Sequence, residues 1–202
     1  MALPEEEAAT SAISSTSRLK EFRLGRHCAR RALQQFHVNS PVFRNPDTRE
    51  PLWPDGVVGS ITHSGKWAAA VAAPTSEIAA IGIDMEQIPR SINPGIARLV
   101  CTEKEKAWLA SLDATQADLG LKAVFSAKES IYKCLFPRCR IPLTFQDATI
   151  TLRDDWQSFR FQLHRPCPPF LPEPEPEHEG VLTFNHETLL SGVFINPVKS
   201  AR

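Results

Sequence analysis

The chain has 202 residues, with 23 basic and 23 acidic side chains and a formal net charge of zero. That length fits one medium domain or two small ones, and an apolar content of 42% is enough for a hydrophobic core. A net charge of zero argues against a general nucleic-acid-binding protein, because such proteins are usually basic overall. No apolar run approaches the roughly 18 to 20 residues that a membrane-spanning helix needs.

The N-terminus and the cysteines both indicate a cytoplasmic protein. Residues 1–17 are acidic and rich in Ser, without the basic start and apolar stretch of a secretory signal, and we predict that they form a flexible segment. The five cysteines are odd in number and scattered along the chain. That usage is typical of reduced thiols rather than of a disulfide framework.

The first half of the chain predicts one helix followed by strands. Apolar residues recur every three, four or seven positions over residues 18–36, which predicts a helix. The proline-rich residues 40–56 predict a loop or an edge segment. Three short apolar runs at residues 57–65, 66–74 and 78–88 are bounded by Gly, Pro or Ser, and each predicts a strand.

The second half predicts two helices and then a further set of strands. The first helix covers residues 96–112, where Thr102 and Glu105 have the spacing of a capping box. The second runs from about residue 117 to residue 136 and is expected to stop at Pro137. Strands are predicted at residues 143–152, 156–164 and 181–195.

Between the strands predicted at 156–164 and 181–195, residues 166–179 hold six prolines and four glutamates. This composition predicts an extended, exposed loop. The order helix, strands, helix, helix, strands indicates an α+β fold. We divide the chain into a flexible segment (residues 1–17), an N-terminal half (18–77) and a C-terminal half (78–202).

Two carboxylates stand out in the strand IGIDMEQI. Asp84 and Glu86 are two positions apart, so a strand places both on one face. Two carboxylates on one face repel each other and are costly to bury unless a cation joins them. The alternative is that the strand ends in solvent at this point, where both carboxylates are simply hydrated.

The later helix carries a third carboxylate beside two lysines. Glu129 and Lys133 are four positions apart, which is also the spacing of an ordinary surface ion pair. The apolar positions of this helix place Lys128, Glu129 and Lys133 near or beyond the border of its core-facing side. Mg²⁺ prefers oxygen ligands and often bridges carboxylates and substrate phosphates, so this group suits a metal bound to a phosphorylated ligand.

Two further features could bind phosphate. His63 adjoins the hydroxyl of Thr62, and such a group can donate several hydrogen bonds to one phosphate, although a single His after a strand is more often structural. The helix over residues 18–31 carries six cations with Glu21 as its one acidic residue. A solvated face would usually mix the two signs, so an anionic partner is favoured.

The motifs in this order resemble those of the 4′-phosphopantetheinyl transferases of the monomeric type. The resemblance covers residues 18 to 150, and its most specific part is the pair GIDxE and FSAKESxYK. The motifs that carry it are EFRLGRHCARRAL, PLWPDGVVGSITHSG, IGIDMEQI, CTEKEKAWL and FSAKESIYKCLFP. The resemblance implies two similar α+β halves related by a pseudo-twofold axis, with the coenzyme and the metal at their junction.

The resemblance also implies roles for individual residues. Asp84, Glu86 and Glu129 would hold Mg²⁺ against the pyrophosphate of coenzyme A, and Glu129 would also act as the catalytic base. The remaining residues would bind the phosphates of the coenzyme; they are Arg18, Lys20, Arg26, Arg49, Thr62, His63, Lys128 and Lys133.

The implied reaction transfers 4′-phosphopantetheine from coenzyme A to a serine of an acyl or peptidyl carrier protein and releases adenosine 3′,5′-bisphosphate. A monomer without nucleic-acid or membrane partners is expected. Two alternatives are another Mg²⁺-dependent phosphotransferase or nucleotide hydrolase, and an RNA-binding module that uses the basic helix. The first is disfavoured because this chain has neither a Walker-type loop nor a kinase signature. The second would need aromatic residues for base stacking, and the helix has only Phe22 and Phe36.

Overall fold

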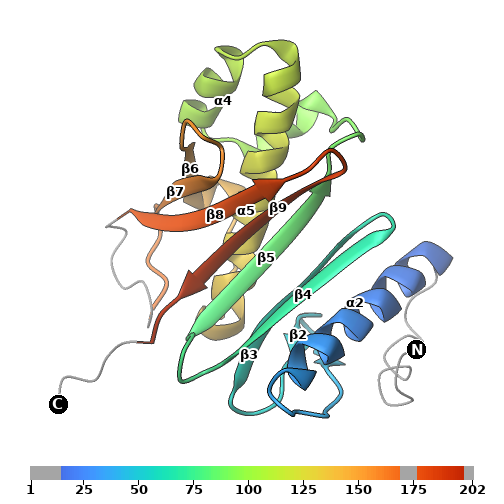
Figure 1. Ribbon diagram of the computed structural model, residues 1–202. Helices are drawn as coiled ribbons and strands as arrows, with labels where there is room; N and C mark the ends of the chain where they lie inside the picture. The colour runs from blue at the N-terminus through green and yellow to red at the C-terminus, as the bar shows by residue number, and fades with distance from the viewer. Residues whose placement is uncertain (1–14, 169–176, 198–202) are drawn as a thin grey trace.

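The N-terminal half consists of one long helix packed on a β-hairpin. The computed structural model describes residues 15–168 and 177–197, and Figure 1 shows its arrangement. Helix α2 (Thr16–Gln34) lies along the hairpin of β3 (Val57–Ser64) and β4 (Trp67–Pro74). A small core forms between them, in which Ala29, Leu33 and Val42 are fully buried. The segment between helix and hairpin contains the two-residue strands β1 (Phe43–Arg44) and β2 (Pro51–Leu52).

The C-terminal half packs a second long helix on a five-stranded antiparallel sheet. The sheet has the order β5-β9-β8-β7-β6, and α5 (Ala114–Cys139) covers one of its faces (Figure 1). The strands are β5 (Ala80–Gln87), β6 (Ala148–Leu152), β7 (Ser158–Leu163), β8 (His178–Phe184) and β9 (Thr188–Ile195). Apolar residues of the helix and the inner sheet face form the main core. Each half therefore places one long helix against antiparallel strands, and the predicted α+β fold is confirmed.

The short helices differ from the prediction. The stretch predicted as one helix is divided into the 3-10 turn η2 (Pro94–Ile96), α3 (Ala97–Val100) and α4 (Glu103–Ala110). Thr102 is extended and starts the second of these helices, with the predicted capping box to Glu105 in place. The capping box is thus confirmed, and it explains the division because a cap residue cannot lie inside a continuous helix.

Several predicted element ends also differ from the structure. Strand β8 begins at His178, so the last two residues of the predicted Pro/Glu-rich loop belong to a strand. Helix α5 continues past Pro137 to Cys139, because a proline in the last turn removes only one intrahelical hydrogen bond. The strand predicted from residue 143 begins only at Ala148, after the 3-10 turn η3 (Phe145–Asp147).

Side chains of β3 join the two halves. The hydroxyl oxygens of Ser60 and Thr62 accept hydrogen bonds from the backbone N–H groups of Ile83 and Met85, both at 3.0 Å. The bonded residues are two positions apart on each strand, so the two bonds hold β5 beside β3 in a single register. Asp84 lies between the two bonded residues of β5, so its position is set by the junction itself.

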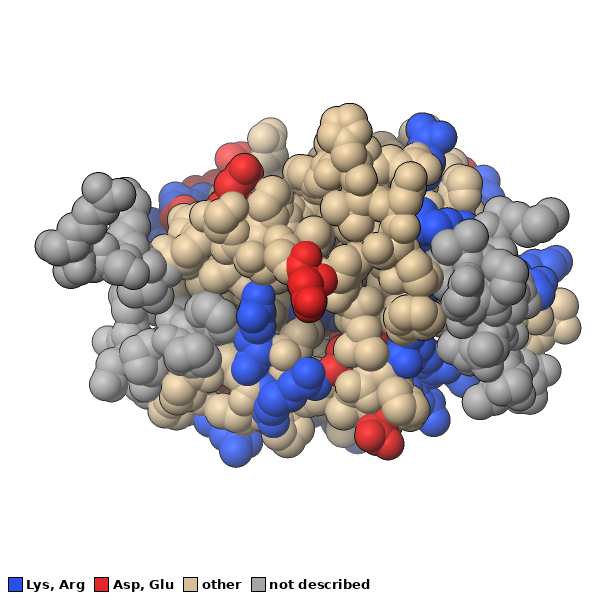
Figure 2. Space-filling view, turned by 90° about the horizontal axis from the view of Figure 1, so that it is seen from below, with Lys and Arg blue, Asp and Glu red and all other residues tan. Residues whose placement is uncertain are grey.

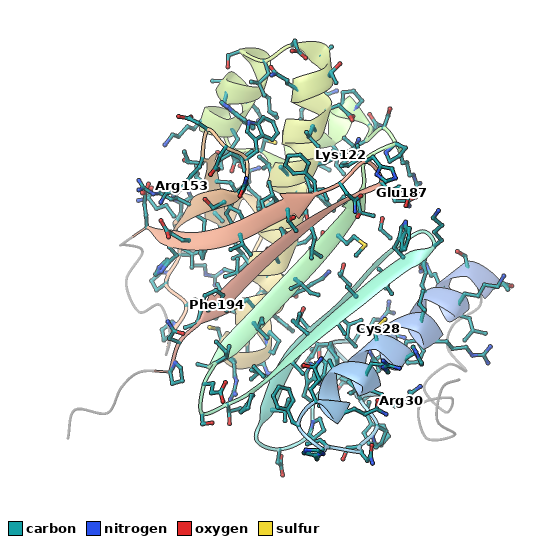
Figure 3. The ribbon with its side chains drawn as sticks, in the orientation of Figure 1. Cys28, Arg30, Lys122, Arg153, Glu187 and Phe194 are labelled. Atoms are coloured by element: carbon teal, nitrogen blue, oxygen red, sulfur yellow. The ribbon has the colours of Figure 1, made fainter. Side chains whose placement is uncertain are left out.

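Other predictions concern cysteines, membranes and the ends of the chain. All five cysteines are free thiols, and Cys28 on α2 donates to the carbonyl oxygen of Ala68 on β4 at 3.6 Å (Figure 3). Within the described ranges, no helix combines the length and apolar character that crossing a membrane requires. Most of the predicted flexible segment (residues 1–14) and most of the Pro/Glu-rich loop (residues 169–176) lie outside the described residues.

Candidate active site at the junction of the two halves

A large cleft opens between α2, the loop around β1 and β2, β3 and the second half of α5. Its volume is about 1510 Å³. Of the residues predicted to bind phosphates, Arg18, Arg26, Arg49, His63 and Lys133 line it. Seen from below, Lys and Arg side chains gather around the middle of this face of the molecule, with single acidic side chains between them (Figure 2). The cleft is therefore suited to an anionic ligand.

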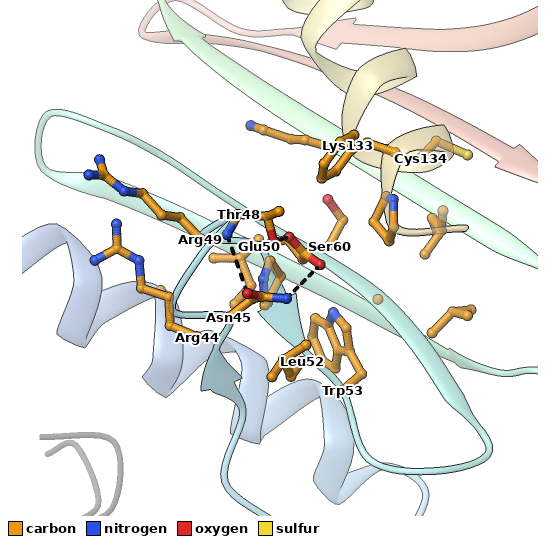
Figure 4. Close-up of a pocket in the computed structure, with 18 of the residues that line it drawn as sticks. Arg44, Asn45, Thr48, Arg49, Glu50, Leu52, Trp53, Ser60, Lys133 and Cys134 are labelled. Atoms are coloured by element: carbon orange, nitrogen blue, oxygen red, sulfur yellow. Dashed lines mark hydrogen bonds between the residues drawn. The ribbon is translucent and has the colours of Figure 1, made fainter. Parts of the chain in front are cut away.

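Three more cations that the sequence analysis did not single out also line the cleft: Arg44, Arg138 and Arg140. Figure 4 shows Arg44, Arg49 and Lys133 extending toward the same side of the cleft. Arg140 forms an ion pair with Glu50, which links the end of α5 to the β1–β2 loop. No sequence signal separates these arginines from ordinary surface cations, because only the folded loop brings them to the cleft.

The close approach of α5 to β5 places the acidic residues together. A Cβ atom on Gly82 would lie 2.0 Å from the carbonyl oxygen of Ser130 and 2.4 Å from the backbone nitrogen of Cys134. Only glycine permits this contact between helix and strand. It brings Glu129 and Lys133, one turn apart on the helix, beside the end of β5.

Asp84 is the most buried acidic residue of this group. It is 5% exposed, and its Oδ1 accepts hydrogen bonds from Lys133 Nζ at 2.5 Å and from the hydroxyl of Thr62 at 3.2 Å. Its second oxygen, Oδ2, is buried without a hydrogen-bond partner among the described residues. A buried carboxylate oxygen of this kind is costly, and a bound cation would satisfy it.

The three predicted metal ligands lie close enough to influence one another's protonation. Burial and the Asp84 carboxylate raise the pKa of Glu86 to about 7, although Lys133 opposes the shift. Burial also raises the pKa of Glu129, against the effect of Lys133 and with that of Asp84. Lys133 thus interacts with all three carboxylates, and its single positive charge cannot balance them. A divalent cation would neutralise the remaining negative charge.

The carboxylate oxygens of Asp84, Glu86 and Glu129 are of the type that Mg²⁺ prefers, but they do not converge on one point in this structure. In the part of the chain that the structure describes, no three His, Cys, Asp or Glu side chains converge closely enough to form a ready-made metal site. Lys133 occupies the Asp84 oxygen that a metal would otherwise share. Hard oxygen ligands, a partnerless Asp84 oxygen and mutual repulsion nevertheless make these residues suitable to hold Mg²⁺.

The structure does not bring Lys128 to the cleft. The side chain was expected near or beyond the border of the core-facing side, but the residue is only 4% exposed. Its Nζ donates to Glu105 Oε2 and to the carbonyl oxygens of Val100 and Phe145, each at 2.7 Å. All three donors of the ammonium group are used inside the protein, so no donor remains for a coenzyme phosphate.

Thr62 and Lys20 also lie apart from the lining of the cleft. Thr62 is 2% exposed, and its hydroxyl is committed to Asp84 and to the backbone of β5, which replaces the expected contact with a coenzyme phosphate. Lys20 is exposed on α2. Asp84 and Glu86 themselves lie just outside the cleft and connect to it through Lys133, which lines it.

Comparison with known families decides the affiliation of the chain. A model described as the 4′-phosphopantetheinyl transferase N-terminal domain matches residues 5–73, and a model of the 4′-phosphopantetheinyl transferase superfamily matches residues 80–178. The chain belongs to the 4′-phosphopantetheinyl transferase superfamily. The first matched range contains α2 and His63, and the second contains the three carboxylates, so the superfamily match includes both walls of the cleft.

Individual relatives of the superfamily cover most of this chain. The 4′-phosphopantetheinyl transferase Svp of Streptomyces mobaraensis is 36% identical over 165 residues, which are 81% of this chain and 66% of that protein. The transferase PptT of Mycobacterium tuberculosis is 36% identical over 151 residues, 74% of this chain and 65% of that protein. Enterobactin synthase component D of Salmonella typhi is 32% identical over 149 residues, which are 74% of this chain and 60% of that protein. The chain thus spans slightly less than two thirds of the length of these relatives.

Among solved structures, the holo-[acyl-carrier-protein] synthase of Thermotoga maritima aligns with a TM-score of 0.48 at 18% identity. The alignment covers 60% of this chain and 66% of that chain.

Proposed function

We propose that this protein transfers the 4′-phosphopantetheine group of coenzyme A to a serine hydroxyl of an acyl or peptidyl carrier protein. The observation that carries the proposal is the cleft itself, in which a cation-rich wall from the N-terminal half meets Glu129 and Lys133 of α5, with Asp84 of β5 paired to Lys133 at its border. The membership of the chain in the superfamily and the names of its relatives support the same reaction.

Each part of the cleft has a role in this reaction. Arg18, Arg26, Arg49 and His63 bind phosphates of coenzyme A, and Lys133 neutralises the pyrophosphate. Asp84, Glu86 and Glu129 would hold Mg²⁺, which when bound polarises the pyrophosphate and stabilises charge on the leaving group. Positioning and charge stabilisation dominate phosphoryl-type transfers, and the arrangement of cations around the cleft supplies both.

Glu129 accepts the proton of the attacking hydroxyl. The serine oxygen forms a bond to the phosphorus next to pantetheine, the pyrophosphate P–O bond breaks, and adenosine 3′,5′-bisphosphate leaves with the bonding electron pair. A base must remove the serine proton as this happens. Burial raises the pKa of Glu129 above that of an ordinary glutamate, which strengthens it as a proton acceptor near neutral pH.

We further propose that the enzyme acts as a cytoplasmic monomer. Both walls of the cleft come from one chain, so no second copy is needed to complete it. Five free cysteines agree with a reducing compartment.

Mass spectrometry of carrier proteins tests the proposal. The protein, coenzyme A and MgCl₂ are incubated with a panel of purified fatty-acid, polyketide and nonribosomal-peptide carriers, and with each carrier after replacement of its acceptor serine by alanine. We expect at least one carrier to gain the mass of one phosphopantetheinyl group and its serine-free control to gain none. Hydrolysis of coenzyme A or of a nucleotide without any adduct would favour a different phosphotransferase or hydrolase, and tight RNA binding without either reaction would favour the RNA-binding alternative.

A further inference from the structure

Glu21 is an acidic side chain in a cleft whose charged lining residues are mostly cations. Helix α2 carries it, and the side chain is 21% exposed and lines the cleft together with Arg18 and Arg26. Removing a carboxylate from a site that binds polyphosphate should improve binding unless the carboxylate does something else. Among the other acidic residues of the cleft, Glu50 pairs with Arg140, Glu129 belongs to the acidic group, and Asp55 is exposed to solvent.

The neighbour of Glu21 is His63. Its Nδ1 lies 3.6 Å from Glu21 Oε2, and the two residues come from different elements, α2 and the end of β3. The His63 side chain is 46% exposed and also lines the cleft. A carboxylate beside Nδ1 favours a proton on that nitrogen, and in the doubly protonated ring Nε2–H remains free to donate to a ligand.

The charges around His63 oppose one another. Burial lowers the pKa of His63 and Lys133 lowers it further, whereas the carboxylates of Glu21 and Asp84 raise it. Glu21 has the largest effect of the neighbouring charges and counteracts the loss of the imidazolium form. A protonated imidazole is the better donor to phosphate because charge-assisted hydrogen bonds are the stronger ones.

We infer that Glu21 is a positioning residue, which holds the imidazole of His63 with its Nε2–H directed at a phosphate group of the coenzyme. The inference rests on the proposed function, since it takes coenzyme A as the ligand of the cleft. Glu21 then strengthens coenzyme binding, although its negative charge alone would repel the phosphates.

Binding measurements on four variants test this assignment. Calorimetric titration with coenzyme A is carried out on the full chain, on Glu21→Gln, on His63→Ala and on the double variant. We expect Glu21→Gln to bind coenzyme A about tenfold more weakly, the size of one charge-assisted hydrogen bond of about 1.5 kcal/mol. In the His63→Ala background the same substitution should cause no further loss, because Glu21 acts through His63. Glu103→Gln, which removes the same charge from a 91% exposed side chain on α4, should leave affinity unchanged.

Imidazole ¹⁵N chemical shifts provide a readout that does not depend on the coenzyme. The ligand-free protein should show a proton on His63 Nδ1, and Glu21→Gln should shift the tautomer populations while circular dichroism stays unchanged. Tighter or unchanged coenzyme binding in Glu21→Gln, or an equal loss in the His63→Ala background, would overturn the inference. If the full chain binds no coenzyme A while the tautomer shift is present, it is the proposed function that fails.

Discussion

Replacing Lys128 with Met tests whether this lysine stabilises the fold or binds the coenzyme. The substitution keeps the length of the side chain and removes the ammonium group. Its three acceptors are Glu105 Oε2 and the carbonyl oxygens of Val100 and Phe145, which join α4, the end of α3 and η3 to α5. Lys133→Met is the matched control, because it lies on the same helix and faces the cleft.

The expected loss of stability follows from the burial of the pair. The side chains of Lys128 and Glu105 are 2% and 0% exposed, so Lys128→Met leaves a carboxylate inside the protein without its counter-charge. Breaking one partner out of a buried ion pair costs about 3–5 kcal/mol. Glu105 keeps two donors, the backbone N–H groups of Thr102 and Ile150, so we expect about 3 kcal/mol, the lower end of that range.

The control should differ in both measurements. Lys133 is partly exposed, but its partner Asp84 is buried, so Lys133→Met should lower the free energy of unfolding by about 1–2 kcal/mol, less than Lys128→Met. Urea unfolding followed by tryptophan fluorescence measures stability, and calorimetric titration with coenzyme A measures binding. We expect Lys128→Met to lose stability at unchanged coenzyme affinity, and Lys133→Met to lose affinity with the smaller loss of stability.

One result would refute this reasoning. A Lys128→Met variant that keeps its stability to within about 1 kcal/mol and binds coenzyme A much more weakly would place the ammonium group at the coenzyme rather than in the buried pair.

Three other predictions concern the acidic group and its setting. Gly82→Ala should destabilise the protein by about 1–3 kcal/mol or more and reduce transfer, because the added Cβ would collide with the backbone of α5; urea unfolding and the carrier assay would detect both effects. Asp84→Asn should abolish the rise in melting temperature that Mg²⁺ causes in the full chain, as measured by differential scanning fluorimetry; an undiminished rise would exclude Asp84 as a ligand. The raised pKa of Glu86, about 7 in the folded protein, means that the folded state holds its proton more tightly than the unfolded state. Without metal, stability should therefore fall as the pH rises from about 5 to about 8, and Mg²⁺ should bind more tightly over the same interval. Glu86→Gln should flatten both dependences in pH-resolved melting curves, and curves that stay unchanged would contradict the assignment.

The positions of the acidic residues on their strand and helix follow from local periodicity. Alternation on β5 places Asp84 and Glu86 on one face whatever surrounds the strand. Helical spacing likewise sets Glu129 and Lys133 one turn apart. The capping box at Thr102 is equally local, since a cap depends only on residues three positions apart.

The roles of Lys128 and Thr62 could not be predicted in this way. Whether a lysine at the border of a helix face is exposed depends on what packs against it, and the acceptors of Lys128 come from segments 17 to 28 residues away. Thr62 faces β5 because the hairpin docks there, which no pattern within the strand reveals. Glu21 was visible only as the single acid among the cations of its helix, and its neighbour His63 is 42 residues further along the chain.

The most direct test of the central claim is a comparison of two products in one reaction. The full chain and Glu129→Gln are incubated with coenzyme A, MgCl₂ and a modified carrier from the panel, and the carrier mass and released adenosine 3′,5′-bisphosphate are quantified together. The account predicts equal molar amounts of both products with the full chain, and neither product with a folded Glu129→Gln variant that still binds coenzyme A. Near-normal transfer by Glu129→Gln would contradict it, because the acidic group at the junction of the two halves would then not perform the reaction.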